Sequence, residues 1–235
     1  MASYTSSHSI DSASTDAYAN YLNTPVSVAS ANVDRDDSDF DIRHGFTTGL
    51  TYDLPPAGSQ KALKAVSGGW SLDAFVLSRT AQPVDVDYST IRADGIALAP
   101  RPNLVPGVPL ELFGSGYPGG KIFNKAAFLQ PPYGGQGDLG RNVLRGFNAA
   151  QADIGVHRIF RLTERTGLRF RGEFFNLFNH PNFGAPTNTV NNALFGRSTQ
   201  TLANGLGAGG ANGGFNPLYR TGGPRSIQSA LKLQF

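Results

Sequence analysis

The C-terminal segment from Ile227 to Phe235 is the feature that most constrains the fold of this chain. Its apolar residues share one parity, and they are Ile227, Leu231, Leu233 and Phe235. The polar residues Gln228, Lys232 and Gln234 share the other parity. Because successive side chains of a β-strand point to opposite faces, this alternation predicts a strand with one apolar and one polar face. Such strands occur in soluble β-domains and in membrane-spanning β-barrels.

The same period of two recurs in other stretches of the chain, and Ala2 to Ile10 shows it weakly. The clearer strands are expected from Phe40 to Leu54, Trp70 to Arg79, Ala152 to Leu162 and Leu168 to Asn179. The apolar parity of these strands and the last one carries Phe46, Trp70, Phe160, Phe170, Phe174, Ile227, Leu231 and Leu233. The polar parity carries Arg43, Asp153, Arg161, Arg169, Arg171, Glu173 and Lys232. The pattern predicts an all-β, antiparallel fold of about six strands.

The connections between the expected strands alternate in length. Going backwards from the last strand, they are Gly184–Gly223 (long), Thr163–Gly167 (short), Thr80–Ala150 (long), Pro55–Gly69 (short) and Asp11–Asp39 (long). Bacterial outer-membrane barrels have short periplasmic turns and long extracellular loops, so the alternation favours a segment of a membrane barrel with its long loops outside. Loops this long are also uncommon in a compact soluble domain. Within them, only Asn124 to Leu129 has a helix-like pattern.

Composition excludes several classes of function. The chain has no cysteine, which excludes a disulfide framework, a thiolate metal site and a cysteine nucleophile. No apolar run approaches the roughly 20 residues of a membrane helix. The net charge is +3, but the arginines are spread over turns and strands with acidic residues between them. We therefore do not expect nucleic acid as a partner.

Three short patterns resemble ligand-binding motifs, and each lacks a necessary part. Asp34 to Asp39 resembles a calcium loop, but the sixth and twelfth positions hold Asp39 and Gly45 instead of Gly and Glu. Gly205 to Gly210 matches G-x-G-x-x-G without the surrounding βαβ unit. The histidines have no metal-ligand spacing, and they are His8, His44, His157 and His180. We expect no catalytic site, cofactor or metal.

Four longer segments occur in a characteristic order. They are Asp39–His44 (DFDIRH), Arg101–Gly107 (RPNLVPG), Gly140–Gly146 (GRNVLRG) and Phe170–Gly184 (FRGEFFNLFNHPNFG). With Pro224–Gln228 and the terminal Phe235, they resemble the C-terminal barrel portion of Oar-like TonB-dependent outer-membrane receptors. Those receptors begin with a carboxypeptidase-regulatory-like domain, followed by a plug and a large barrel.

The resemblance implies a location in the outer membrane of a Gram-negative-type cell. It implies that Phe235 belongs to the signal read by the barrel-assembly machinery. The apolar parity would face outer-membrane lipid, and the polar parity would face the lumen. The activity implied is energy-coupled uptake of an unidentified solute through TonB, without bond-making chemistry.

The chain also departs from the pattern of those receptors. Their barrels resemble the 22-stranded plugged type, whereas this sequence predicts about six strands. Nothing at its start matches a signal peptide, and no segment matches a plug or a TonB-contacting box. We therefore expect residues 1–235 to be the C-terminal part of a larger barrel, with TonB reached only through a missing N-terminal part. Two alternatives stay open, namely a non-transporting outer-membrane barrel for adhesion or surface organisation and a soluble β-sandwich binding module.

Overall fold

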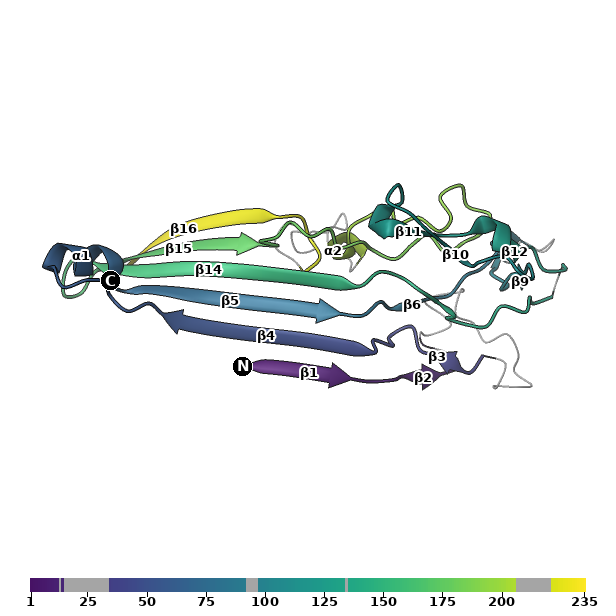
Figure 1. The fold of residues 1–235 in the computed structure, drawn as a ribbon, viewed down its shortest axis with the longest axis horizontal. Coiled ribbons are helices and arrows are strands. Elements are labelled where there is room, and N and C mark those ends of the chain that lie inside the picture. The colour runs from purple at the N-terminus through teal and green to yellow at the C-terminus, as the bar shows by residue number, and fades with distance from the viewer. Residues whose placement is uncertain (13, 15–33, 92–96, 134, 206–220) are drawn as a thin grey trace.

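The computed structural model describes residues 1–12, 14, 34–91, 97–133, 135–205 and 221–235. Its main element is a six-stranded antiparallel sheet (Figure 1). In order across the sheet, the strands are β1 (Ala2–Ser6), β4 (His44–Asp53), β5 (Trp70–Arg79), β14 (Ala149–Arg161), β15 (Gly167–Phe175) and β16 (Ser226–Gln234). The order across the sheet follows the order along the chain, so the strands form a meander. The expected all-β antiparallel fold is confirmed.

Several strand boundaries differ from the sequence expectation, and two of them have local reasons. β4 begins at His44 instead of Phe40, because the chain before it makes a turn in which the backbone N–H of Asp41 donates to the carbonyl of Ser38 at 2.9 Å. β15 ends at Phe175 instead of Asn179, because Asn176 adopts a left-handed conformation with φ of 49°. Such a conformation cannot continue a strand, and asparagine is one of the few residues that adopts it readily.

The connections lie at opposite ends of the sheet according to their length (Figure 1). The turn between β14 and β15 and the connection between β4 and β5 lie at one end, which we call the short-turn end. The second connection contains α1 (Lys61–Ser67), a helix that the sequence did not predict. The described parts of the three long connections lie at the other end, which we call the loop end. The alternation expected from the sequence is therefore confirmed.

The described residues of two long connections, 80–91, 97–133, 135–148 and 176–205, fold into a unit that we call the loop domain. Its short antiparallel pairs are β6 (Pro83–Val84) with β13 (Leu144–Arg145), β7 (Thr90–Ile91) with β8 (Ala97–Leu98), β9 (Asn103–Leu104) with β12 (Phe128–Leu129), and β10 (Glu111–Phe113) with β11 (Lys121–Phe123). It also contains the 3-10 turns η3 (Pro118–Gly120) and η4 (Lys125–Ala127), and α2 (Leu202–Gly205). The helix-like stretch expected at 124–129 is thus η4 followed by β12.

The buried apolar core lies in the loop domain, although the sequence predicted irregular loops there. Its members are Val84, Val86, Phe123, Ala127, Phe128, Leu139, Leu144, Val190 and Phe195. Phe195 packs edge-on against Phe128, with ring centroids 5.5 Å apart. Burial of each large apolar side chain contributes about 1.5–3 kcal/mol to folding, so this cluster holds the two long connections together.

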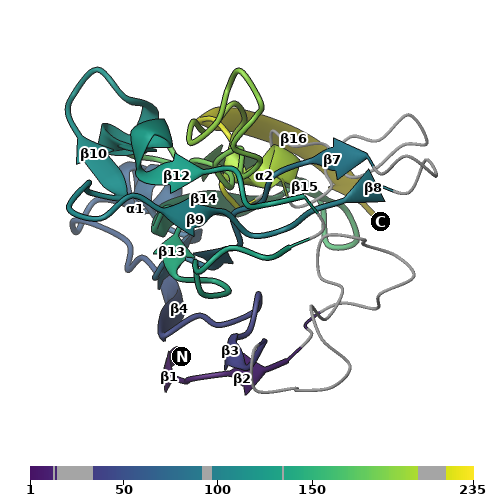
Figure 2. The same cartoon turned by 90° about the vertical axis from the view of Figure 1, so that its right-hand side faces the viewer.

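The six-stranded sheet, in contrast, is a single layer (Figures 1 and 2). Among the described residues, no second sheet covers either of its faces. Large apolar side chains on it are therefore exposed, and Ile227 and Leu231 keep 65% and 68% of their surface accessible. A soluble protein rarely leaves so wide an apolar surface uncovered. A soluble β-sandwich would need a second sheet packed against the face that carries these apolar side chains.

β1 and β16 form the two edges of the sheet within the described residues. A further pair, in the first long connection, is β2 (Ile10–Asp11) with β3 (Asp36–Asp37), which continues beyond the end of β1 toward the loop domain. No helix in the described part of the chain has the length and hydropathy needed to span a membrane.

Candidate functional site: the two sheet faces and the loop junction

The register of the sheet separates its side chains into two faces. Ile154 lies opposite Phe174 on one side and Ala74 on the other, and Phe174 lies opposite Ile227. Directly opposed residues share a face, so these positions and their period-two neighbours define what we call the apolar face. It carries all the residues that the alternation assigned to lipid, namely Phe46, Trp70, Phe160, Phe170, Phe174, Ile227, Leu231 and Leu233.

Aromatic residues cluster on the apolar face near the short-turn end. The ring centroids of Trp70 and Phe170 are 6.0 Å apart, and those of Trp70 and Phe160 are 6.4 Å apart, both edge-to-face. Aromatic belts of this kind occupy the interfacial level of membrane barrels. Phe235 follows the last residue of β16 and is 97% exposed.

The opposite side of the sheet, which we call the polar face, carries Asp153, Arg161, Arg169, Arg171, Glu173 and Lys232. Arg171 and Glu173 form an ion pair of 2.7 Å, and the amide of Gln151 donates to Asp153 at 2.9 Å. Arg169 lies directly opposite Lys232, which places two positive charges side by side. Like charges that are directly opposed repel each other, and the high dielectric constant of water around them would weaken this repulsion.

Arg43, which the alternation assigned to the lumen, lies just outside the paired strands whose register defines the polar face. It precedes β4 by one residue and belongs to a cluster at the loop end. Its Nε donates to Oδ2 of Asp41 at 2.6 Å, and its Nη2 donates to Oδ1 of Asp37 at 2.8 Å. Two carboxylates that precede β4 by a few residues therefore fix this side chain, and the alternation within the strand does not predict these contacts.

The same two carboxylates bind an arginine from the loop domain. Nη2 of Arg145 lies 2.7 Å from Oδ2 of Asp41 and also contacts the carboxylate of Asp37. The side chain of Asp41 is fully buried. Burial alone would raise its pKa, but the hydrogen bonds from the Ser9 N–H, Arg145 and Arg43 outweigh burial and lower the pKa to about 2. Asp41 is therefore a charged acceptor at any physiological pH.

A second cluster joins the same two long connections nearby. Arg141 donates through Nη1 to Asp11 at 2.6 Å and through Nη2 to Asp39 at 3.3 Å. The amide of Asn142 donates to Asp39 at 2.7 Å. Arg101 and Asp34, both almost completely buried, form a further pair at 3.0 Å. We call the two clusters together the loop junction, since they bind the first long connection to the second.

The stretch that follows β15 connects the third long connection to the sheet. Asn176 accepts a hydrogen bond from the N–H of His180 at 2.9 Å and donates through Nδ2 to the carbonyl of Gly223 at 3.0 Å. Asn182 accepts a hydrogen bond from the N–H of Ala150 at 2.8 Å. These asparagines hold the start of the third connection, its end and the start of β14 in one place. The sequence analysis identified the segment Phe170–Gly184 but did not predict that its asparagines hold these parts of the chain together.

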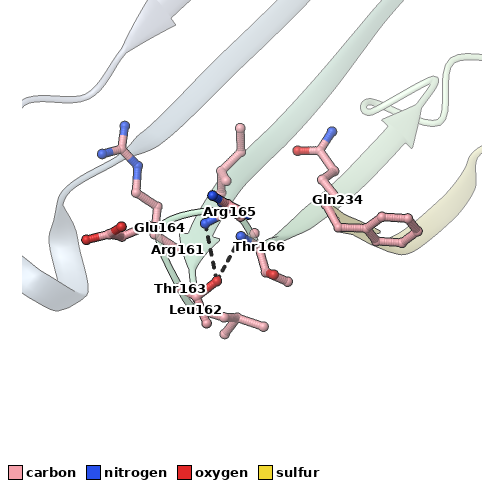
Figure 3. A pocket seen from close by; sticks show the side chains of 10 residues that line it. Arg161, Leu162, Thr163, Glu164, Arg165, Thr166 and Gln234 are labelled. Atoms are coloured by element: carbon pink, nitrogen blue, oxygen red, sulfur yellow. Dashed lines mark hydrogen bonds between the residues drawn. The ribbon is translucent and has the colours of Figure 1, made fainter.

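The sheet has a hollow at its short-turn end and another on its polar face. A shallow hollow of about 750 Å³ surrounds the turn between β14 and β15 (Figure 3). There Thr163 Oγ1 accepts hydrogen bonds from the N–H groups of Arg165 and Thr166 at 3.3 and 3.0 Å, which orders the turn (Figure 3). A second hollow of about 330 Å³ lies on the polar face around Gly155, between Asp73, Asp153 and Glu173. Neither hollow contains a nucleophile next to a base.

The motifs with possible ligand chemistry have other roles or lie outside the described residues. Asp34, Asp37 and Asp39 of the calcium-like stretch bind arginines. Within the described residues, no group of three His, Asp or Glu side chains is arranged to hold a metal ion. His157 instead approaches Asp73 at 3.1 Å. The glycine pattern beginning at Gly205 lies, after its first residue, outside the described residues.

A single-layer sheet with one apolar and one polar face, short turns at one end and folded loops at the other is the wall of an outer-membrane β-barrel. A family model described as "Outer membrane beta barrel domain" matches residues 1–228. The chain belongs to this family, whose members are outer-membrane barrels. No curated protein and no solved structure matches the chain.

Proposed function

We propose that this chain is the C-terminal part of the barrel wall of a TonB-dependent outer-membrane receptor. The receptor would import a solute with energy delivered from the inner membrane through TonB. The apolar face would contact lipid, and the polar face would line the lumen and meet a plug. The N-terminal part that contacts TonB would lie outside residues 1–235.

The observation that carries this proposal is the composition of the loop junction. Each of three segments that resemble Oar-like receptors supplies at least one of its side chains, since Asp41 belongs to the first, Arg101 to the second and Arg145 to the third. The fourth segment supplies Asn176 and Asn182, which fasten the remaining long connection. The four segments therefore all contribute contacts that hold the long connections at the loop end of the sheet, which in the proposed receptor would be the barrel opening where a solute arrives.

The ion pairs of the loop junction suit a receptor whose loops must keep a defined shape. Arg141, Arg145 and Asp41 are held by several hydrogen bonds each, and Asp41 stays ionised over the physiological range. A preformed loop surface binds a ligand with little ordering cost. We infer that the loop domain contributes to solute recognition and that the reaction class is transport, not catalysis.

The experiment compares three strains of the source organism by mass spectrometry of the spent medium. One lacks the full-length gene, one lacks TonB, and the third carries Arg145→Ala in the full-length gene. The proposal predicts that at least one solute is depleted by the wild type but stays in the medium of the first two strains. The Arg145→Ala strain should deplete the same solute more slowly while keeping a wild-type amount of barrel in the outer membrane.

A non-transporting barrel for adhesion or surface organisation is the second candidate, and the separately folded loop domain favours it. If the gene-deletion strain depletes every solute as the wild type does but loses attachment to surfaces, this second function replaces transport.

A further inference from the structure

Arg158 lies on the apolar face, where a charged side chain would meet lipid. It is directly opposite Trp70 in β5 and Phe170 in β15. Its guanidinium lies over the rings of Phe160 and Trp70, at 4.5 and 5.5 Å from their centroids. Aromatic faces attract cations, which offsets part of the cost of this position.

Two guanidinium nitrogens of Arg158 donate hydrogen bonds to the last turn of α1, while the buried Nε has no hydrogen-bond partner among the described residues. Nη1 of Arg158 donates to the carbonyl of Val66 at 2.5 Å, and Nη2 donates to the carbonyl of Ala65. The indole N–H of Trp70 also donates to the carbonyl of Val66, at 3.1 Å. A cation at the C-terminal end of a helix interacts favourably with the free carbonyls there. The C-terminal end of α1 is therefore fastened to the apolar face, at the short-turn end.

The exposed surface of α1 has two sides. Leu63 and Val66, three residues apart on one side, keep 50% and 70% of their surface accessible. Lys61 and Lys64, also three residues apart and exposed, lie on the other side by helical periodicity. An exposed apolar stripe beside a basic one is the pattern of a helix that lies in the interface of a membrane.

We propose that α1 is an interfacial membrane contact, which lies in the phospholipid headgroup layer at the short-turn side of the barrel. Leu63 and Val66 enter the layer at the edge of the hydrocarbon, and Lys61 and Lys64 bind anionic phosphate groups. Trp70 and Arg158 are the attachment that holds the helix at this depth. The helix is hydrogen-bonded to residues of the apolar face, so the lipid that covers this face is its expected occupant. The inference depends on the barrel wall but not on the transported solute or on TonB.

The test uses nitroxide labels in the full-length gene product, reconstituted into phosphatidylethanolamine–phosphatidylglycerol vesicles. Residues 1–235 contain no cysteine, so each single-cysteine variant gives one signal from this region once any cysteine elsewhere is replaced. Labels are placed by Leu63→Cys and Val66→Cys on the apolar side of α1, and by Lys64→Cys on its basic side. Glu164→Cys in the other short turn serves as the aqueous reference, and Leu231→Cys on β16 serves as the lipid reference.

The proposal predicts that collisions with a water-soluble nickel chelate are several-fold rarer at positions 63 and 66 than at positions 64 and 164. Replacing phosphatidylglycerol by phosphatidylcholine should raise nickel access at positions 63 and 66. Arg158→Gln should do the same while leaving position 231 unchanged. The proposal is overturned if positions 63 and 66 are as accessible to nickel as position 164 while position 231 is in lipid. Protection of position 64 along with 63 and 66, unchanged by lipid composition, would also overturn it, because a protein would then cover the helix.

Discussion

Nη2 of Arg145 lies 2.7 Å from Oδ2 of Asp41, although 104 residues separate the two in the sequence. Arg145 is the last residue of β13 in the loop domain, and Asp41 precedes β4 at the loop end of the sheet. Because the carboxylate is fully buried, this pair cannot exchange its partners for water. It therefore determines where the first long connection lies relative to the loop domain.

Asp41→Asn should loosen the loop junction without disturbing the barrel wall. Removal of one partner from a buried ion pair leaves the other uncompensated and costs about 3–5 kcal/mol in fully buried cases. Arg145 is partly exposed, so we expect about 2–3 kcal/mol here. Limited proteolysis of isolated outer membranes should show faster cleavage within residues 34–43, while the peptides of β14 and β15 stay protected.

Arg171→Gln provides the matched control for that experiment. Its partner Glu173 is also within ion-pair distance, but Arg171 is more than half exposed on the polar face. Exposed pairs contribute about 0–1 kcal/mol, so cleavage rates should hardly change. Equal sensitivity of the two variants would show that burial of Asp41 does not determine the strength of the loop junction.

Stability of the loop domain should depend on Asp85 between about pH 4 and pH 6. Burial raises the pKa of Asp85 from 3.8 to about 6, and Arg101 and Arg141 offset only part of that effect. Between these values the folded state binds more protons than the unfolded state, so the free energy of unfolding falls as the pH rises through this window. Asp85→Asn should remove the fall and stabilise the domain at pH 7 by at most about 3 kcal/mol. Hydrogen exchange of loop-domain amides, corrected for intrinsic rates, measures both effects.

Asp41 should show the opposite dependence at lower pH. Its pKa is lowered to about 2 in the folded state, so its contribution is complete above the unfolded value of 3.8 and is lost as the pH falls through about 2. Asp41→Asn should therefore reduce the hydrogen-exchange protection of the amides in residues 34–43 at pH 5. At pH 2 the variant and the wild type should differ little in this protection. A fall in protection of this segment that is centred near pH 6 would contradict the assignment.

Leu231→Arg should destabilise the assembled barrel far more than Lys232→Gln. The two residues are neighbours in β16 but belong to opposite faces of the sheet. A charged residue on the lipid face near the bilayer midplane costs about 2–4 kcal/mol, whereas a lumen-side substitution costs little. Urea unfolding of the full-length gene product in vesicles, followed by its heat-dependent gel shift, compares the variants. Equal tolerance at both positions would refute the parity assignment.

Gly196→Ala should disrupt the core of the loop domain. Gly196 has a φ of 77°, and a Cβ added there would lie 2.6 Å from the carbonyl oxygen of Phe123, a core residue. We expect a loss of about 2–4 kcal/mol from backbone strain and displaced packing. Gly107→Ala is the control, because its φ is 76° but a Cβ would meet no atom within 4 Å. That variant should lose only about 1 kcal/mol. Loop-domain cleavage should rise strongly for the first variant alone.

The sequence predicted the strands and their faces well because both depend on a local period. Phe170 and Leu231 could be assigned to one face by counting residues, and the register confirms that they are directly opposed. Arg158 was missed because a charge at an apolar position is explained only by the carbonyls of α1, which are far away in the sequence. The loop domain was missed for the same reason, since Phe123, Val190 and Val86 form a core without any periodic pattern. The segments that contain Asp41 and Arg145 could be recognised in the sequence, but the contact between them could not, because it depends on how the long connections fold.

The central claim is that the apolar face of the six-stranded sheet contacts lipid and the polar face contacts water. Single cysteines at each residue from Ile227 to Gln234, introduced into the full-length gene product, test it by reaction with a membrane-impermeant maleimide in isolated, lysed outer membranes. The account predicts slow reaction at Ile227, Leu231 and Leu233 and fast reaction at Gln228, Lys232 and Gln234. Uniformly fast reaction along the segment, or protection without a period of two, would contradict a barrel wall built from these strands.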